Sequence, residues 1–169
     1  FFSVFNSDAI KDVKLYKAGV PAQYGGRLSS VLDVKMNNGN EKKITAKGGI
    51  GLIASRLTVE GPLKKDKGAF VISARRTYAD MFLVFAKDSS LRKSKLYFYD
   101  LNAKFNYKIN ENNRVFLSGY FGRDVFNFNN IFSINWGNYT NTARWNHIFN
   151  EKLFLNTSLI YSKYSYDIG

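Results

Sequence analysis

The chain has 169 residues, enough for one ordinary soluble domain, and its 25 Lys and Arg against 13 Asp and Glu give a formal charge of +12. Cysteine is absent and His147 is the single histidine, which excludes disulfides and a multi-histidine metal centre. No run of 18 apolar residues occurs, so a transmembrane helix is excluded, whereas a membrane-crossing strand is short and alternating and stays open.

The positive charge is one reason to consider nucleic-acid binding, and the aromatic residues, which make up 17% of the chain, are another. The basic residues, however, are scattered along the whole sequence, and only 64–67 and 92–95 are locally dense. We therefore expect no nucleic-acid partner. The abundance of Tyr, Phe, Val, Ile and Thr, with only two Pro, instead predicts strands.

The first recognisable element is a turn signal at Tyr24, Gly25, Gly26 and Arg27. Paired glycines can adopt the positive φ that a tight turn requires. For each of these residues the simplest interpretation is an ordinary connection without a ligand.

From about residue 42 the sequence resolves into seven strand-sized segments that alternate in polarity with period two. The segments are 44–52, 56–60, 69–77, 96–109, 114–124, 136–149 and 153–161. Three positions fit poorly. Arg76 falls on the apolar set of its segment, and Phe116 and Tyr120 fall on the polar set of the fifth.

Segment 96–109 alternates most cleanly, with apolar odd positions from Tyr97 to Ile109 and mostly polar even positions. Its length exceeds the about 5–6 residues of a globular strand and suits the about 9–11 residues of a tilted membrane strand. Aromatic residues gather at the two ends of the segments, as they do in interfacial girdles. These residues are Tyr97, Phe98 and Tyr99 at one end and Tyr107, Trp145 and Phe149 at the other.

The connections are expected to alternate in length. Tight polar turns are predicted at 64–68, 110–113 and 150–152, and long loops at 81–95 and 125–133. The turn near 53–55 is the exception, because it is short although it lies on the side of the long loops. Tight turns on one side and long loops on the other are typical of outer-membrane barrels.

Two architectures explain the alternation. In a soluble β-sandwich the apolar face packs inward, whereas in a membrane barrel it meets lipid and the polar face lines the lumen. Strand length, aromatic placement and loop asymmetry favour the barrel. Seven strands cannot close an even-stranded barrel, so we expect further strands outside these 169 residues.

A family resemblance covers most of the chain and is strongest over residues 10–80. Residues 10–35, which contain the run Tyr24-Gly25-Gly26-Arg27-Leu28-Ser29, resemble the end of the plug domain in TonB-dependent receptors. Residues 48–63 and 73–78 are similar to the first barrel strands of Bacteroidota members of that family. The Tyr-Gly-Gly-Arg run is the most specific of these motifs.

The resemblance implies an all-β membrane protein: an antiparallel transmembrane barrel of about 22 strands with an N-terminal plug. Residues 1–40 would be the end of the plug and 41–169 the first part of the barrel. It implies import of an iron chelate, a glycan or a peptide across the bacterial outer membrane, driven by TonB through an N-terminal box that lies outside this sequence. Lipopolysaccharide and a surface lipoprotein are the further partners it implies, and neither a cofactor nor an enzymatic activity is expected.

Candidate site residues follow from the polar face and from the predicted loops. Charges that could line the lumen are Lys47, Arg56, Glu60, Arg75, Asp100, Lys104, Lys108 and Arg144. They could attract anionic cargo, but pairing with the plug and with one another is the simpler interpretation. Candidate contacts in an outer loop are Phe126, Phe128 and Phe132, because exposed aromatics suit cargo or a partner protein.

Other functions find less support in the sequence. The glycines of 49–54 loosely match a dinucleotide fingerprint, but the residues after them alternate as a strand and not as a helix. His147 has no Ser or Asp signature that would make it half of a catalytic pair. The main alternative to import is an outer-membrane structural, assembly or binding subunit with a transporter-like barrel, and a soluble lectin-like sandwich is a further one.

Overall fold

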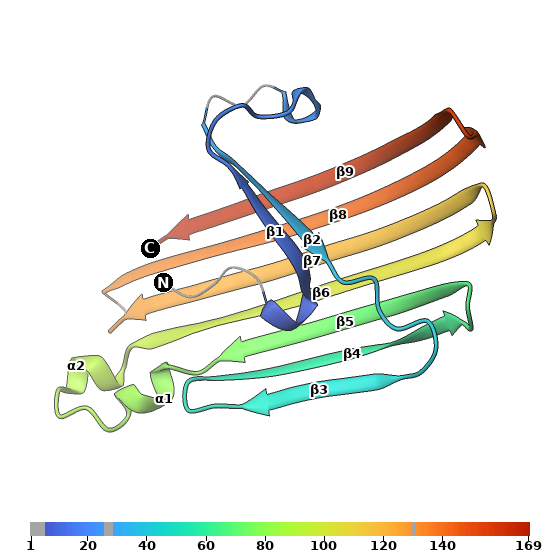
Figure 1. The fold of residues 1–169 in the computed structure, drawn as a ribbon. Helices are drawn as coiled ribbons and strands as arrows, with labels where there is room; N and C mark the ends of the chain where they lie inside the picture. The colour runs from blue at the N-terminus through green and yellow to red at the C-terminus, as the bar shows by residue number, and fades with distance from the viewer. Residues whose placement is uncertain (1–5, 26–28, 130) are drawn as a thin grey trace.

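The computed structural model describes residues 6–25, 29–129 and 131–169, which form an all-β, antiparallel structure with a few short helical turns (Figure 1). The strands are β1 (Ile10–Tyr16), β2 (Val31–Met36), β3 (Thr45–Ile50), β4 (Ala54–Lys64), β5 (Gly68–Thr77), β6 (Lys95–Asn110), β7 (Asn113–Phe128), β8 (Phe132–Asn150) and β9 (Leu153–Ile168). The helical turns are η1 (Ser7–Ala9), η2 (Ala22–Tyr24), α1 (Asp80–Leu83) and α2 (Ser89–Arg92).

Strands β3 to β9 form one seven-stranded sheet in which each strand pairs with its neighbour in sequence. The prediction of seven strands after residue 42 is confirmed, although β7, β8 and β9 run longer than expected. β4 also continues through Pro62, where its pairing with β3 has already ended at Glu60. A proline lacks the amide donor of a ladder, so this position beyond the end of β3 suits it.

Tight turns join the strands at one end of the sheet, which we call the turn end. They follow β4, β6 and β8, and Asp66 in the first of them has a φ of 59°. At the turn after β6, Lys108 Nζ lies 2.6 Å from Glu111 Oε2, and this hydrogen bond lowers the pKa of the Glu111 carboxyl. The opposite end, which we call the loop end, carries residues 78–94 with α1 and α2 between β5 and β6.

The predicted long loop over 125–133 is wrong. β7 continues to Phe128 and β8 begins at Phe132, and the turn between them starts at Asn129, whose φ is 50°. Phe126 pairs with Ile134, and Phe128 with Phe132, so the alternating Phe and Asn residues extend the ladder instead of leaving it. The three phenylalanines proposed as loop contacts therefore lie at strand ends.

β1 and β2 pair with each other in a separate two-stranded sheet that crosses the large one (Figure 1). We call residues 6–25 and 29–36 the N-terminal unit, and 37–44 the connecting segment that leads from it into β3. The Tyr16 and Tyr24 rings lie 5.8 Å apart between their centroids and close the far side of the unit.

The sheet has an inner face, which the N-terminal unit covers, and an outer face on the opposite side. Polar residues of the inner face that lie under the N-terminal unit are buried, with Ser73 0% and Asn106 1% exposed, whereas Leu57 and Leu117 on the outer face are 53% and 54% exposed. Among the described residues, the buried hydrophobic core amounts to Ala9, Ala69 and Val71. The polarity is thus inverted relative to a water-soluble fold, in which apolar faces are buried.

None of the helices in the described part of the chain is both long enough and apolar enough to cross a membrane.

Candidate functional site: the interface between the N-terminal unit and the sheet

Asn6 anchors the start of the N-terminal unit to the inner face. Its side-chain oxygen caps η1 by accepting a 3.1 Å hydrogen bond from the Asp8 amide, which leaves its amide group free to point at the sheet. Asn6 Nδ2 donates to Ser73 Oγ of β5 at 2.5 Å, and Ser73 shares a 2.8 Å hydrogen bond with Thr58 of β4. Asn6 is only 1% exposed, so its amide depends on this partner.

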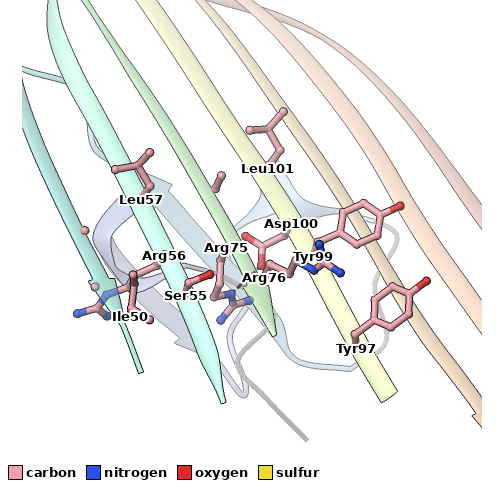
Figure 2. Close-up of a pocket in the computed structure, with 13 residues that line it drawn as sticks. Ile50, Ser55, Arg56, Leu57, Arg75, Arg76, Tyr97, Tyr99, Asp100 and Leu101 are labelled. Carbon is pink, nitrogen blue, oxygen red and sulfur yellow. Dashed lines mark hydrogen bonds and ion pairs between the residues drawn. The ribbon is translucent and has the colours of Figure 1, made fainter. Parts of the chain in front are cut away.

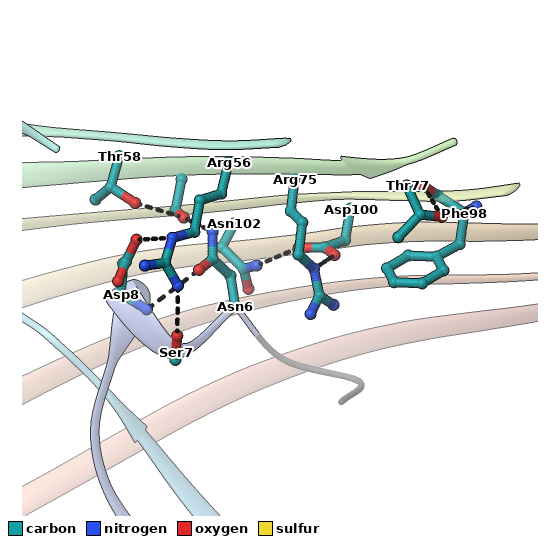
Figure 3. Close-up of polar contacts among 11 residues, drawn as sticks. Asn6, Ser7, Asp8, Arg56, Thr58, Arg75, Thr77, Phe98, Asp100 and Asn102 are labelled. Carbon is teal, nitrogen blue, oxygen red and sulfur yellow. Dashed lines mark hydrogen bonds and ion pairs between the residues drawn. The ribbon is translucent and has the colours of Figure 1, made fainter. Parts of the chain in front are cut away.

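Arg56 of β4 forms the second anchor of η1 (Figure 3). Its Nε lies 3.2 Å from Asp8 Oδ2, and its Nη1 donates to Ser7 Oγ at 3.4 Å. The Arg56 side chain is half exposed, and an ion pair in such a setting contributes up to about 1 kcal/mol. The contact therefore orients η1, but it contributes little to the free energy that holds η1 on the sheet.

The connecting segment is tied to two strands near the turn end. Lys104 Nζ and Asn106 Nδ2, both on β6, donate to the carbonyl oxygens of Met36 and Asn38 at 3.1 and 2.6 Å. Arg114 Nη2 of β7 lies 2.7 Å from Glu41 Oε1. Polar contacts thus hold the segment where it crosses the inner face from the N-terminal unit to β3.

Gly39 makes this close approach possible. Its φ is +85°, a conformation that L side chains rarely adopt, and a Cβ at this position would overlap the carbonyl oxygen of Phe70. The backbone can therefore lie directly against β5 only because residue 39 has no side chain.

Arg75 and Asp100 form a buried ion pair beside these anchors, on the loop-end side. Asp100 Oδ2 lies 2.7 Å from Arg75 Nε, and Asn102 Nδ2 donates to the other carboxylate oxygen at 3.3 Å. The Arg75 guanidinium also lies 4.8 Å from the centre of the Phe98 ring. A buried pair held by several partners fixes the geometry of the neighbouring strands.

All eight charges predicted for one face lie on the inner face, because they follow the register of Ser73 and Asn102. Lys108 lies at the turn end of this face and pairs with Glu111. Arg56 and Lys104 contact the N-terminal unit, Arg75 and Asp100 pair with each other, and Glu60 accepts a 3.0 Å hydrogen bond from Thr45. Contacts with the N-terminal unit or with one another, as the simpler interpretation expects, are thus present for Arg56, Arg75, Asp100 and Lys104, whereas Glu60 contacts Thr45 of β3. Within the described residues, Lys47 and Arg144 form no ion pair, and Arg144 donates only to Ser158 at 3.3 Å.

Phe116 explains the mixed character of its segment. It lies on the inner face, opposite Asn106, with Lys104 Nζ and the Arg114 guanidinium each 5.8 Å from its ring centre. A ring between two cations is favourably placed through its π-face, so an aromatic side chain fits this polar face.

The plug turn is described only in part. Tyr24 ends η2, and Gly25 has a φ of −51°, so this glycine does not use the positive φ that a glycine allows. Gly26 and Arg27 lie outside the described residues. No ligand role for the turn follows from the contacts seen here.

Several residues of the interface were missed by reasoning from the sequence. They are Asn6, Ser7, Asp8, Asn38, Glu41, Ser73, Asn106 and Arg114. Ser73, Asn106 and Arg114 carried a signal, because they are polar positions of alternating segments. The others lie in irregular segments, where no periodicity marks them.

The outer face carries a broad apolar band between two aromatic rows. On β6 it runs from Tyr99 to Tyr107, about 26 Å along the strand at about 3.3 Å per residue. In the turn-end row Trp145 follows Tyr107 two strands away, through Val115. Tyr97 and Tyr99 belong to the loop-end row as predicted, but Phe98 lies on the inner face against Arg75.

Comparisons with protein-family models, with curated proteins and with solved structures found no match to this chain.

Proposed function

We propose that the chain belongs to a plug-gated, TonB-dependent transporter that imports a scarce nutrient across the bacterial outer membrane. In this proposal β3 to β9 are part of the wall of a transmembrane barrel of about 22 strands. The N-terminal unit is the end of the plug, and the inner face lines the lumen.

The inverted polarity of the sheet carries the proposal. The outer face exposes Leu57 and Leu117 by 53% and 54%. Exposing such side chains to water costs about 25 cal/mol per Å² of apolar surface, whereas contact with acyl chains removes that cost. The apolar band between Tyr99 and Tyr107 spans about 20 Å if the strand tilts by about 40°, near the about 25 Å of an outer-membrane barrel.

The polar interface suits a plug that must leave the wall. Hydrogen bonds such as Asn6–Ser73 and Lys104–Met36 can be exchanged for water, at a net cost of about 1 kcal/mol each. Only Ala9, Ala69 and Val71 are buried hydrophobics among the described residues, so separation exposes little apolar surface. A pull from TonB on the N-terminal side would therefore release the unit without unfolding the wall.

Two inner-face cations support an anionic cargo among the candidate nutrients. Lys47 and Arg144 are exposed and lack an ion pair in the described structure. Their positive charges would therefore attract anions into the lumen. Phe126, Phe128 and Phe132 at the loop end are proposed contacts for cargo or for a surface lipoprotein. An iron chelate, a glycan and a peptide are the classes to be compared.

The test uses the full-length protein that contains this chain, expressed in a Gram-negative host. Detergent-free lysates should hold it in the outer-membrane fraction, and recovery in the soluble fraction would contradict the proposal. Cells are then offered ferric citrate, a maltooligosaccharide and an oligopeptide. We expect uptake of one probe that stops when the proton-motive force is collapsed.

A membrane-bound protein that takes up none of the probes, before or after energisation, would instead support a structural or binding subunit.

A further inference from the structure

The connecting segment contains three asparagines, and one of them has a free side chain. The Asn37 amide donates to two carbonyl oxygens of the N-terminal unit, at 3.1 and 3.4 Å. The side-chain oxygen of Asn40 accepts two backbone amides, at 2.9 and 3.2 Å. The Asn38 side chain is exposed and forms no hydrogen bond with the described residues. Of the three, it is the one that can turn back onto the main chain.

The residue after Asn38 is Gly39, whose backbone N–H donates to no acceptor in the described part of the chain. No side chain on residue 39 shields this nitrogen, because a Cβ there would overlap the Phe70 carbonyl oxygen. A backbone nitrogen therefore lies next to a side-chain amide carbon, and neither group is held by a hydrogen bond. Two groups joined in this way react as if at a high concentration of each other.

Asn106 of β6 is placed to activate the Gly39 amide. Its Nδ2 donates to the Asn38 carbonyl oxygen at 2.6 Å, and the residue is only 1% exposed. When the Gly39 amide loses its proton, the negative charge is shared with that carbonyl oxygen, because both atoms belong to one peptide group. A donor already directed at this oxygen stabilises the charge without reorganisation. The Lys104 ammonium, which donates to the Met36 carbonyl at 3.1 Å, adds positive charge to this stretch of the segment.

We propose that Asn38 and Gly39 form a site of spontaneous deamidation in the folded protein, activated by Asn106. The Gly39 nitrogen gives its proton to solvent and bonds to Cγ of Asn38, and the side-chain amide leaves as ammonia after taking a proton from water. A cyclic succinimide remains. Water then adds to one ring carbonyl, the bond from that carbon to the Gly39 nitrogen breaks, and the nitrogen takes up a proton. The net change is one water consumed and one ammonia released.

The two possible products differ in their main chain. Addition of water at the side-chain carbonyl gives aspartate, whereas addition at the main-chain carbonyl gives isoaspartate, in which the chain runs through Cβ and Cγ. The isoaspartyl linkage adds a methylene to the main chain just before Gly39, and its free carboxylate is the group that faces Asn106. Because Gly39 lies directly against the Phe70 carbonyl, the longer chain displaces it and loosens the segment where it crosses β5.

The experiment follows the folded full-length protein that contains this chain, incubated at mildly alkaline pH in water enriched in heavy oxygen. Peptide mass spectrometry with electron-transfer fragmentation measures conversion at each asparagine and separates aspartate from isoaspartate. We expect Asn38 to be lost with uptake of one heavy oxygen, while Asn37 and Asn40 stay unchanged over the same time. Conversion at Asn38 that is no faster than at Asn37 or Asn40 would overturn the assignment.

Asn106→Asp tests the activating role, because it replaces the donor with a carboxylate of nearly the same size. Loss of activation should slow the conversion of Asn38 by about tenfold. A merely structural role would have the opposite effect, since a loosened segment converts faster. Asn138→Asp makes the same change on the exposed inner face of β8 and should leave the rate unchanged. An unchanged or increased rate in a folded Asn106→Asp variant would overturn the role of Asn106.

The comparison among the three asparagines needs no variant, so it tests the site even if Asn106→Asp does not fold. The converted protein can be separated by its added negative charge. Hydrogen exchange of residues 37–44 in its isoaspartyl fraction should show a loss of protection, and full protection would contradict the predicted loosening. The inference does not depend on the proposed transport function, and a protein that takes up no cargo would leave it standing.

Discussion

Arg75 and Asp100 face each other across β5 and β6 with Nε 2.7 Å from Oδ2, and Asp100 has a side chain only 3% exposed. The pair lies on the face that a plug would cover, beside the residues that hold η1. A buried charge without its partner is strongly destabilising, which makes this pair a sensitive probe of the wall.

Asp100→Ala should lower the free energy of unfolding by about 3 kcal/mol, because the Arg75 guanidinium is left buried without its counter-charge. Urea titration of the full-length protein in detergent measures this loss. The double variant Arg75→Met with Asp100→Leu replaces both charges with apolar groups and should recover most of it. A loss below about 1 kcal/mol for Asp100→Ala would show that water reaches the pair.

A disulfide between the N-terminal unit and the wall should block transport. The 169 residues contain no cysteine, and the Asn6 and Ser73 side chains are in direct contact, so Asn6→Cys with Ser73→Cys introduces one defined pair. We expect uptake to stop under oxidising conditions and to return after reduction. Each single cysteine variant is the matched control. Undiminished uptake by the fully oxidised double variant would rule out displacement of this part of the unit.

Gly39 and Gly19 form a natural comparison, since both have positive φ but only Gly39 is crowded. Gly19→Ala should cost about 1 kcal/mol through backbone strain alone. Gly39→Ala should cost more, because its Cβ overlaps the Phe70 carbonyl and pushes the connecting segment off β5. Hydrogen exchange of residues 37–44 measures the difference. Equal protection in the two variants would contradict the close approach.

Leu117→Arg tests the environment of the outer face. Leu117 is 54% exposed, so in water the change would be nearly neutral. In a bilayer an arginine near mid-depth on the lipid side costs about 2–4 kcal/mol. Thr142→Arg places the same charge at a similar depth on the inner face and is the control. Folding into lipid vesicles, followed by the shift of the folded band on unheated gels, should fail for Leu117→Arg only.

The number of strands and the identity of the polar face could be predicted because strand alternation is a local property. Lys47, Arg56 and Arg144 each occupy the polar set of alternating positions in their segment. Strand pairing places the polar sets of neighbouring strands on the same face of the sheet. The same local rule failed at 125–133. Asn is rare in strands, so the Phe-Asn run resembles a loop, yet antiparallel pairing of its backbone extends the ladder to Phe128 and Phe132.

The interface itself could not be predicted from local patterns. Asn6 and Ser73 are 67 residues apart, and nothing in either neighbourhood identifies the other as its partner. Glu41 and Arg114 are 73 residues apart and meet only because the connecting segment crosses three strands. Arg76, by contrast, was visible as a charge in an apolar set, and its position beside a groove on the outer face gives that anomaly a physical reason (Figure 2).

Within the described residues, the N-terminal unit shares no ladder hydrogen bonds with the sheet of β3 to β9, since β1 pairs only with β2. The anchors of this unit and of the connecting segment to the sheet follow one another along the chain, first at Asn6 to Asp8, then at Met36 and Asn38, and last at Glu41. Tension applied from the amino-terminal side would load these points in succession, as in unzipping. The force needed at any instant would be that of the single anchor under load, not the sum of all of them.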